Sequence, residues 1–268
     1  MSTGSRWTCP GFDVVEHPGA RVLARPEVVP WVRVVLGGGQ SLHAASARDK
    51  DALRLEGRDP VFVIPAKIPK GEGTISRDAW AVRHYVRGGR LFPKLLGDRY
   101  FKSRRVRPYH EVEASEAARS RGIPTPKVMA AAMYPTGPFY RGDMVTTFVP
   151  DASDLVDALF DTRRKGAGGA AERLDSLRAA GELVRRMAEV GLRHRDLHAR
   201  NILLEWQGAA PRTHLLDLDR CEVGPAGVPL SPTSMHLRLR RSLKKWEHRT
   251  GIHILDKEWD ALDRAVAG

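Results

Sequence analysis

The stretch HRDLHARNILL, residues 194–204, places an aspartate, a second histidine and an asparagine at tight spacing and follows them with an apolar run. Shortly afterwards the chain reads HLLDLDR, residues 214–220, which offers two more aspartates. A buried carboxylate costs free energy unless another group pairs with it. The two stretches together therefore indicate a site that holds a cation, transfers a proton, or does both.

The residues around these stretches predict a β-hairpin. ILLEW (202–206) and THLLDLD (213–219) are short apolar runs, and a turn is expected between them at residues 208–211. Such a hairpin puts Asn201 at the start of one strand and Asp217 at the end of its partner. We expect the two side chains to converge on one place.

The bulk composition describes an ordinary globular chain. Its 268 residues are 42% hydrophobic and 28% charged, enough for one large domain or two lobes. No apolar run reaches the roughly 20 residues of a membrane helix, and residues 1–13 contain no apolar signal core, so we expect a cytoplasmic protein. Cys9 and Cys221 are too few for a disulfide framework or a zinc cage.

The formal net charge of +12 favours anionic partners. Nucleic acid, an anionic membrane surface and a phosphorylated substrate all fit this charge. No reader motif or aromatic-interleaved basic patch accompanies it, so we do not expect nucleic acid. The basic helix predicted at residues 236–248 carries Leu239, Leu243 and Trp246 at helical spacing. It either lies on a membrane or packs its apolar stripe against the rest of the chain.

The order of predicted elements divides the chain into three parts. Residues 1–60 have little recognisable pattern and are an N-terminal extension, either an additional strand layer or a tail. Residues 61–150 carry strands at 61–68, 80–86, 127–134 and 140–149, with a helix at about 108–121. Residues 151–268 are mostly helical, with a long amphipathic stretch at 174–190. The predicted class is α+β with a β-rich N-lobe and a helical C-lobe.

The arrangement resembles the protein-kinase-like fold, in which His-Arg-Asp-Leu-x-x-x-Asn precedes a metal-binding aspartate. The resemblance implies that Asp196 accepts the proton of the acceptor hydroxyl. It also implies that Asn201 and Asp217 supply oxygen ligands to Mg²⁺ during transfer of the γ-phosphoryl group of ATP.

The same resemblance suggests a nucleotide site earlier in the chain. Gly71 and Gly73 stand where a glycine-rich phosphate cover belongs, and Arg83 stands where protein kinases carry a phosphate-binding lysine. Glu111 is the expected acid partner of Arg83, and Glu113 is the next choice. An ordinary hairpin turn, an outward-facing strand arginine and solvated helix carboxylates are the alternatives. Residues 146–150 are expected to offer backbone groups to adenine.

Three departures separate the chain from a protein kinase that acts on proteins. His198 replaces the usual lysine, and Asp219-Arg220 replaces the glycine that usually follows the metal-binding aspartate. Little chain lies between Asp217 and the helix predicted near Ser231, and no Ala-Pro-Glu closes it. The acceptor is therefore expected to be a small or lipid-linked molecule.

Several further motifs make the chain similar to the lipopolysaccharide kinase family, in particular to 3-deoxy-D-manno-octulosonic acid (Kdo) kinases. In order they are RHYVRGG (83–89), GDRY (97–100), RPYHE (107–111), GIPTP (122–126) and DLDR (217–220). The similarity covers about residues 71–246. It implies ATP-dependent phosphorylation of a Kdo hydroxyl on a lipid A precursor, an anionic glycolipid, at the cytoplasmic face of the inner membrane. It also implies that an arginine at position 83 is normal.

Two other readings of the sequence stay open. Aminoglycoside- and choline-type phosphotransferases also carry Asp-Leu-His-x-x-Asn, but they usually have glycine where Arg195 stands. A non-catalytic module that uses the fold to bind a lipid or a protein is the other reading. Intact Asp196, Asn201 and Asp217 count against it. The oligomeric state is not predicted.

Overall fold

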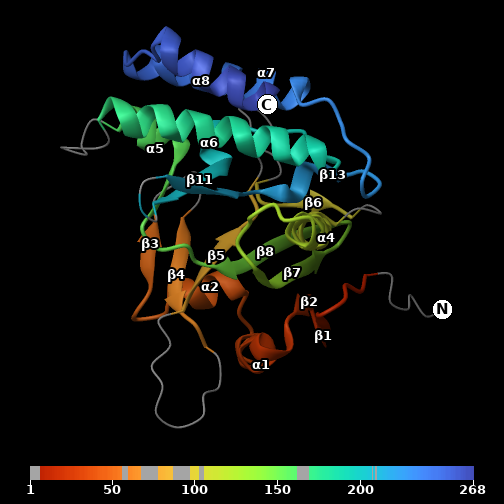
Figure 1. Ribbon diagram of the computed structural model, residues 1–268. Helices are drawn as coiled ribbons and strands as arrows, with labels where there is room; N and C mark the ends of the chain where they lie inside the picture. The colour runs from red at the N-terminus through yellow and green to blue at the C-terminus, as the bar shows by residue number, and fades with distance from the viewer. Residues whose placement is uncertain are drawn as a thin grey trace. The chain divides into compact units, whose positions relative to one another are not determined.

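The computed structural model describes residues 7–55, 60–67, 78–86, 97–102, 106–161, 169–206, 208 and 210–268. The chain forms two compact units (Figure 1). Unit 1 contains residues 1–113 and 127–148, and unit 2 contains residues 114–126 and 149–268. The helix α4 (Arg107–Ser120) is divided between them.

Unit 1 is built on an antiparallel sheet with the strand order β1-β2-β7-β8-β5-β4-β3, to which β6 adds by pairing with β8. These strands are β1 (Asp13–His17), β2 (Ala20–Ala24), β3 (Leu53–Leu55), β4 (Val61–Pro65), β5 (Ala79–His84), β6 (Tyr100–Phe101), β7 (Val128–Thr136) and β8 (Phe139–Thr147). The predicted strands at 61–68, 80–86, 127–134 and 140–149 are therefore present with shifted ends.

The N-terminal residues, whose structure the sequence left open, belong to this sheet. They form β1, β2 and β3 and, between them, the 3₁₀ turn η1 (Pro26–Val28) and the helices α1 (Val29–Gly37) and α2 (Leu42–Ala47). Gly19 takes a positive φ of 82° in the turn that joins β1 to β2. This conformation is easy for glycine because it has no Cβ, so the turn closes without strain.

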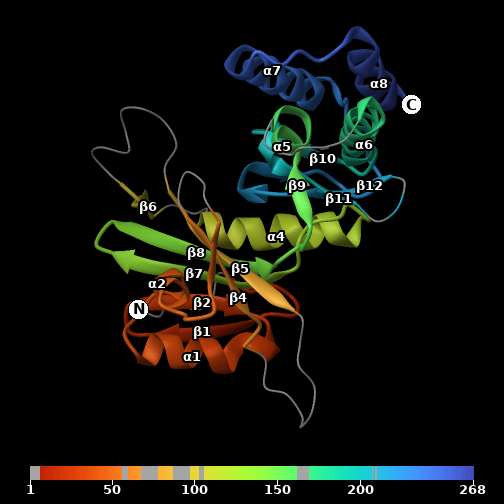
Figure 2. The same cartoon turned by 90° about the vertical axis from the view of Figure 1, so that its left-hand side faces the viewer.

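Each face of the sheet in unit 1 is covered by a separate apolar cluster. The helices α1 and α2 lie on one side of the sheet (Figure 2), and their side chains pack with Trp80 and Val82 of β5. Tyr109 and Val112 of α4 pack with Tyr85 and Met144 on the other. Trp80 and Val82 of β5 therefore point to one face and Tyr85, the residue after β5, points to the other, as the pleat of a strand requires.

Unit 2 combines helices with two small sheets. Its helices are α5 (Leu155–Phe160), α6 (Ala170–Glu189), α7 (Thr233–Thr250) and α8 (Asp256–Ala267), with 3₁₀ turns η2 (Ala199–Asn201) and η3 (Leu218–Arg220). Strands β9 (Ala152–Asp154), β11 (Ile202–Trp206) and β12 (Pro211–Leu215) form one sheet, and β10 (Leu192–His194) pairs with β13 (Cys221–Val223) in the other. The predicted hairpin is confirmed as the antiparallel pair β11–β12.

The core of unit 2 includes the apolar stripe of α7. Met235, Leu239 and Leu243 are fully buried in this core, and Trp246 packs against it while partly exposed. The sequence left two possibilities for residues 236–248. The structure shows the second, in which the apolar stripe packs against the rest of the chain. None of the helices among the described residues is long and apolar enough to cross a membrane.

Candidate active site

The loop that carries Asp196 is anchored on both sides by buried apolar residues. It follows β10, and Leu197 and Ala199 are buried in the core of unit 2 while Asp196 itself is exposed. The backbone N–H of Ala199 donates to Ser242 Oγ of α7 at 3.1 Å. The carboxylate of Asp196 is therefore presented to solvent from a fixed backbone.

His194 joins the Asp196 loop to the Asp217 segment. Its Nδ1 accepts a hydrogen bond from the backbone N–H of Asp196 at 3.2 Å. Its Nε2 donates to the carbonyl of Asp217 at 3.0 Å and lies 3.3 Å from that of Leu216. Burial lowers the pKa of His194 and outweighs the opposing effect of Asp217 and Asp196. A neutral ring with its proton on Nε2 satisfies all of these contacts.

Asn201 is bonded to both segments. Its side-chain Nδ2 donates to the carbonyl of Asp196 at 3.3 Å, and its own carbonyl accepts from the N–H of Leu216 at 2.8 Å. The residue is only 5% exposed, so its amide is held in a defined orientation. The structure thus brings together the three residues that the sequence predicted to act as one site, namely Asp196, Asn201 and Asp217.

Asp217 has a left-handed backbone, with φ 57° and ψ 58°. Non-glycine residues take this conformation uncommonly, and Asp and Asn tolerate it best. It occurs after β12 has ended and where η3 begins, and the next two residues, Leu218 and Asp219, are buried. Residues with such backbones cluster at functional sites.

The donor atoms at this site suit a hard divalent cation. Asn201 contributes an amide oxygen and Asp217 a carboxylate, and Mg²⁺ prefers few protein oxygens with water and phosphate filling the remaining positions. Among the described residues, no group of three or more His, Cys, Asp or Glu side chains is arranged to hold a metal ion. A metal ion held by Asn201 and Asp217 would take its remaining ligands from water and phosphate oxygens.

Two ion pairs that the sequence did not predict lie beside the loop that carries Asp196. Arg220 Nη1 lies 3.7 Å from Asp196 Oδ2, and both side chains are about half exposed. Arg195 forms an ion pair with Glu222 of β13. In the β10–β13 pair, Glu222 lies directly opposite Arg193. The DLDR motif contains Arg220, but the pairing of Arg220 with Asp196 depends on the β10–β13 register. No local sequence pattern encodes that register.

In unit 1, the structure brings Arg83 and Glu111 into contact. Arg83 of β5 forms an ion pair with Glu111 of α4, and Tyr85 donates its hydroxyl proton to the same carboxylate oxygen. Glu111 is 4% exposed, whereas the Glu113 side chain is 51% exposed and lies 3.9 Å from His110. Of the two predicted partners, Glu111 is therefore the one that holds Arg83.

Two other predicted features are the glycine-rich phosphate cover and the adenine connector. Gly71 and Gly73 lie outside the described residues. In the predicted adenine connector, the N–H groups of Thr147 and Phe148 donate at 2.8 Å to the carbonyls of Lys127 and Ala79. These two donors belong to the sheet, so the expectation that they face adenine is wrong for them.

A second charged cluster in unit 1 was missed. His84, Asp98, Asp143 and Arg141 are linked by hydrogen bonds and ion pairs. Two of the four, His84 and Asp98, lie within motifs quoted for the family similarity, but the partners are far apart in sequence. Predicting which acid meets which base at such separations requires knowledge of the strand register.

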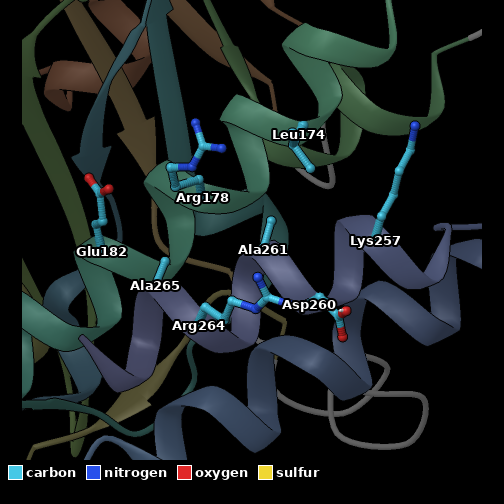
Figure 3. A pocket seen from close by; sticks show the side chains of 8 residues that line it. All are labelled: Leu174, Arg178, Glu182, Lys257, Asp260, Ala261, Arg264 and Ala265. Atoms are coloured by element: carbon cyan, nitrogen blue, oxygen red, sulfur yellow. Dashed lines mark ion pairs between the residues drawn. The ribbon is translucent and has the colours of Figure 1, made fainter.

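The helices of unit 2 also form a shallow groove of about 470 Å³ (Figure 3). It lies between α6 and α8 and is lined by Leu174, Arg178, Glu182, Lys257, Asp260, Ala261, Arg264 and Ala265. Arg264 pairs with Asp260 at 3.7 Å, and both are well exposed. None of the residues predicted to act in catalysis lines this groove.

Comparison with known proteins identifies the family. The family model described as "Lipopolysaccharide kinase (Kdo/WaaP) family" matches residues 71–264. A 3-deoxy-D-manno-octulosonic acid kinase of Haemophilus influenzae (strain PittEE) is 31% identical over 205 residues, covering 72% of this chain and 80% of that protein. The corresponding kinase of Actinobacillus succinogenes is 33% identical over 185 residues, covering 68% and 72%.

The fold agrees with this match. The solved structure of WaaP in complex with acyl carrier protein aligns with a TM-score of 0.52 at 17% identity, covering 92% of this chain and 88% of that one. The predicted α+β kinase-like fold is therefore confirmed. Since the family model spans most of the chain and relatives above 30% identity cover two thirds or more of it, the chain belongs to the lipopolysaccharide kinase (Kdo/WaaP) family.

Proposed function

We propose that this protein transfers the γ-phosphoryl group of ATP to a hydroxyl of Kdo on a lipid A precursor. The relatives named Kdo kinase support the acceptor, and the kinase family supports the reaction type. The observation that carries the proposal is the arrangement around His194, which bonds to both the Asp196 and the Asp217 segments while Asn201 bonds to the same two. This is the set of residues that phosphoryl transfer needs.

In this proposal the acceptor hydroxyl oxygen attacks the γ-phosphorus as the bond to the bridging oxygen of ADP breaks. Asp196, presented to solvent from a rigid loop, accepts the hydroxyl proton. Asn201 and Asp217 would hold Mg²⁺, which neutralises charge on the phosphates. Arg220, close to Asp196, adds positive charge beside the base.

The nucleotide-binding role falls to residues 61–150 and the catalytic role to residues 151–268, with residues 1–60 adding β1, β2 and β3 to the sheet of the first part. Arg83, fixed by Glu111 and Tyr85, would bind phosphate oxygens, because a guanidinium can contact them in a bidentate manner and keeps its charge at all relevant pH values. Gly71 and Gly73 would contribute backbone N–H groups to the phosphates.

A lipid-linked acceptor is consistent with the segment after Asp217. β13 ends at Val223 and α7 begins at Thr233, so only residues 224–232 connect them. Protein kinases use a long segment here to bind a peptide substrate, and this chain has no comparable length. A sugar acceptor needs no such platform.

Peripheral contact with the cytoplasmic face of the inner membrane is part of the proposal. The face of α7 opposite its buried stripe is exposed and basic, and it carries Arg238, Arg241, Lys244, Lys245, His248 and Arg249. Exposed Leu237 lies among them. An anionic bilayer attracts such a surface at about 1 kcal/mol per basic residue near the membrane.

The reaction is tested by transfer of labelled γ-phosphate from Mg-ATP to Kdo–lipid A precursor. We expect wild-type protein to label the lipid, Asp196→Asn to lose nearly all transfer, and the exposed control Asp260→Asn to retain it. Labelling of an amino sugar or choline in place of the lipid would replace the proposed acceptor with that of the aminoglycoside- and choline-type enzymes. Absence of any transfer, with no thermal shift on adding Mg-ATP, would favour a binding module.

The membrane contact is tested separately by co-sedimentation with vesicles. Binding to vesicles rich in anionic phospholipid, weak binding to neutral vesicles and a loss of several-fold on raising the salt concentration are expected. The triple variant Arg241→Glu, Lys244→Glu, Lys245→Glu should lose binding. A control triple variant on another exposed surface, Arg178→Glu, Lys257→Glu, Arg264→Glu, should keep it. Equal loss in both would mean that net charge alone, and not α7, determines binding.

A further inference from the structure

Unit 1 contains a polar pocket of about 480 Å³ that the proposed reaction does not use. It is lined by the turn between β1 and β2, the segment that leads into α2, the ends of β5 and β7, and the start of β8. Among its lining residues are Gln40, Ser41, His84, Asp98, Thr136 and Arg141. Its volume lies within the range of small-molecule sites, about 300–1,000 Å³.

The base of this pocket is a buried ion pair. His84 Nδ1 lies 2.6 Å from Oδ1 of Asp143, which is completely buried. The other oxygen of Asp143 accepts from the backbone N–H of His43 and from the hydroxyl of Tyr134, both at 2.9 Å. The carboxylate is thus fully bonded within the protein, and it fixes the orientation of the imidazole that lines the pocket.

The rim of the pocket carries a second acid and base. Asp98 Oδ2 lies 3.1 Å from His84 Nε2 and 2.8 Å from Arg141 Nε. The Asp98 side chain is 29% exposed and that of Arg141 is 45% exposed, so both can reach a ligand. Burial by itself would lower the pKa of His84, but Asp143 and Asp98 outweigh it and raise the pKa.

The acids and bases of this cluster pair with one another. The two carboxylates contact the Arg141 guanidinium and the His84 ring, so each base already has an acid partner that competes with a phosphate or a carboxylate. Asp98 also places acceptor oxygens toward the pocket, which disfavours an anion further. Donors and acceptors alternate instead, since Arg141 and Gln40 can donate while Asp98, Gln40 and Ser41 can accept. Alternating donors and acceptors match the hydroxyl groups of a sugar ring.

We propose that this pocket binds a pyranose sugar, with Asp98, Arg141 and Gln40 bonding its hydroxyl groups and His84 holding Asp98 in place. A purely structural ion cluster would tie the strands together without needing an opening of this size. The site shares no residue with the phosphoryl-transfer set, so the proposal does not depend on the acceptor assigned above. The sugar can be a free monosaccharide or part of a glycolipid.

The test measures the binding of D-glucose, D-glucosamine and free Kdo to the full chain by saturation-transfer NMR. Inorganic phosphate is the anionic probe. Thr136 is exposed at the end of β7, so Thr136→Trp should fill the pocket without disturbing the core. Arg141→Ala removes a proposed donor. The matched control is Arg33→Trp, on an exposed position of α1 that does not line the pocket.

We expect saturable binding of at least one sugar, weakened tenfold or more by Thr136→Trp and by Arg141→Ala and unchanged by Arg33→Trp. No saturable sugar binding, or binding that neither pocket variant alters, overturns the proposal. Binding of phosphate without sugar overturns the ligand class. The KM of the Kdo–lipid A precursor then distinguishes a free monosaccharide from a glycolipid. Thr136→Trp should raise this KM only if the bound sugar belongs to that lipid. This last measurement rests on the proposed function.

Discussion

Arg83 and His84 are neighbours in β5, and their side chains bind acids on opposite faces of the same sheet. Arg83 pairs with Glu111 of α4, while His84 pairs with Asp143, which lies directly across from it in β8. This follows from the alternation of side chains along a strand. One dipeptide therefore supports both the proposed phosphate-binding pair and the base of the polar pocket.

The first prediction concerns the acid that holds Arg83. Replacing Glu111 by glutamine removes the charge that fixes the guanidinium, so catalytic efficiency with ATP should fall about 10- to 100-fold, corresponding to the roughly 1.5–3 kcal/mol of a charge-assisted hydrogen bond. Steady-state kinetics with varied ATP measures this. Glu113→Gln is the matched control, because that side chain is 51% exposed on the same helix. Equal losses in the two variants would show that Glu111 does not act through Arg83.

The second prediction separates the backbone role of Asp217 from its carboxylate. Asparagine tolerates a left-handed backbone about as well as aspartate, so Asp217→Asn should melt within a degree or two of wild type. Alanine should cost about 1–2 kcal/mol at this φ. Both variants lose the charged ligand, so kcat should fall at least about 100-fold in each. Thermal melts beside turnover assays distinguish the two effects. An active Asp217→Asn would remove Asp217 from the metal site.

The sequence predicted the parts of the site that depend on local spacing. Asn201 and Asp217 lie close together because a short hairpin joins them, and a hairpin can be recognised from its apolar runs and turn residues. Glu111 could be named as the partner of Arg83 because the fold family puts an acid on the helix that follows this strand. In each case the argument needed only a nearby pattern or a known fold.

Other features depend on information that no local pattern contains. His84 and Asp143 are 59 positions apart and meet only because of the β5–β8 register. The α7 stripe predicted a helix, but its burial depends on the core it packs against. The N-terminal hairpin could have been found, because Pro18 and Gly19 form a turn signal between two alternating runs.

The third prediction is a pH dependence of stability that arises from His84. Because the pKa of His84 is raised in the folded chain, its contribution to stability is complete below the ordinary value of 6.5 and is lost as the pH rises through the folded value. The Tm should therefore fall above pH 6.5, and His84→Gln should have a lower Tm below that pH with a flatter profile above it. Melts from pH 6 to 9 test this.

The control for this prediction is His248→Gln, which replaces an exposed histidine on α7. Its profile should follow that of wild type. Asp98 does not titrate in this range. Burial by itself would raise the pKa of Asp98, but His84 and Arg141 outweigh it and lower the pKa. The contribution of Asp98 to stability is therefore lost only below about pH 3.8. A His84→Gln profile parallel to wild type throughout this range would mean that the ion pair does not titrate there.

The last prediction concerns the contact between α6 and α8. Glu258 of α8 is 1% exposed and receives two hydrogen bonds from Arg173 of α6, at 2.9 and 3.0 Å, and another at 2.9 Å from the N–H of Leu255. The helices approach closely because Gly181 has no side chain, since a Cβ there would lie 2.6 Å from the carbonyl of Leu262.

Breaking a buried ion pair by removing one charge leaves the other uncompensated, at a cost of about 3–5 kcal/mol. Arg173 is partly exposed, so Glu258→Gln should destabilise unit 2 by about 2–3 kcal/mol, measured as a lower midpoint of urea unfolding. Asp260→Asn, on an exposed position of the same helix, should leave the midpoint unchanged. If the two variants unfold at the same urea concentration, apolar packing around Gly181 is sufficient to hold α8 on α6, and the ion pair contributes orientation without net stability.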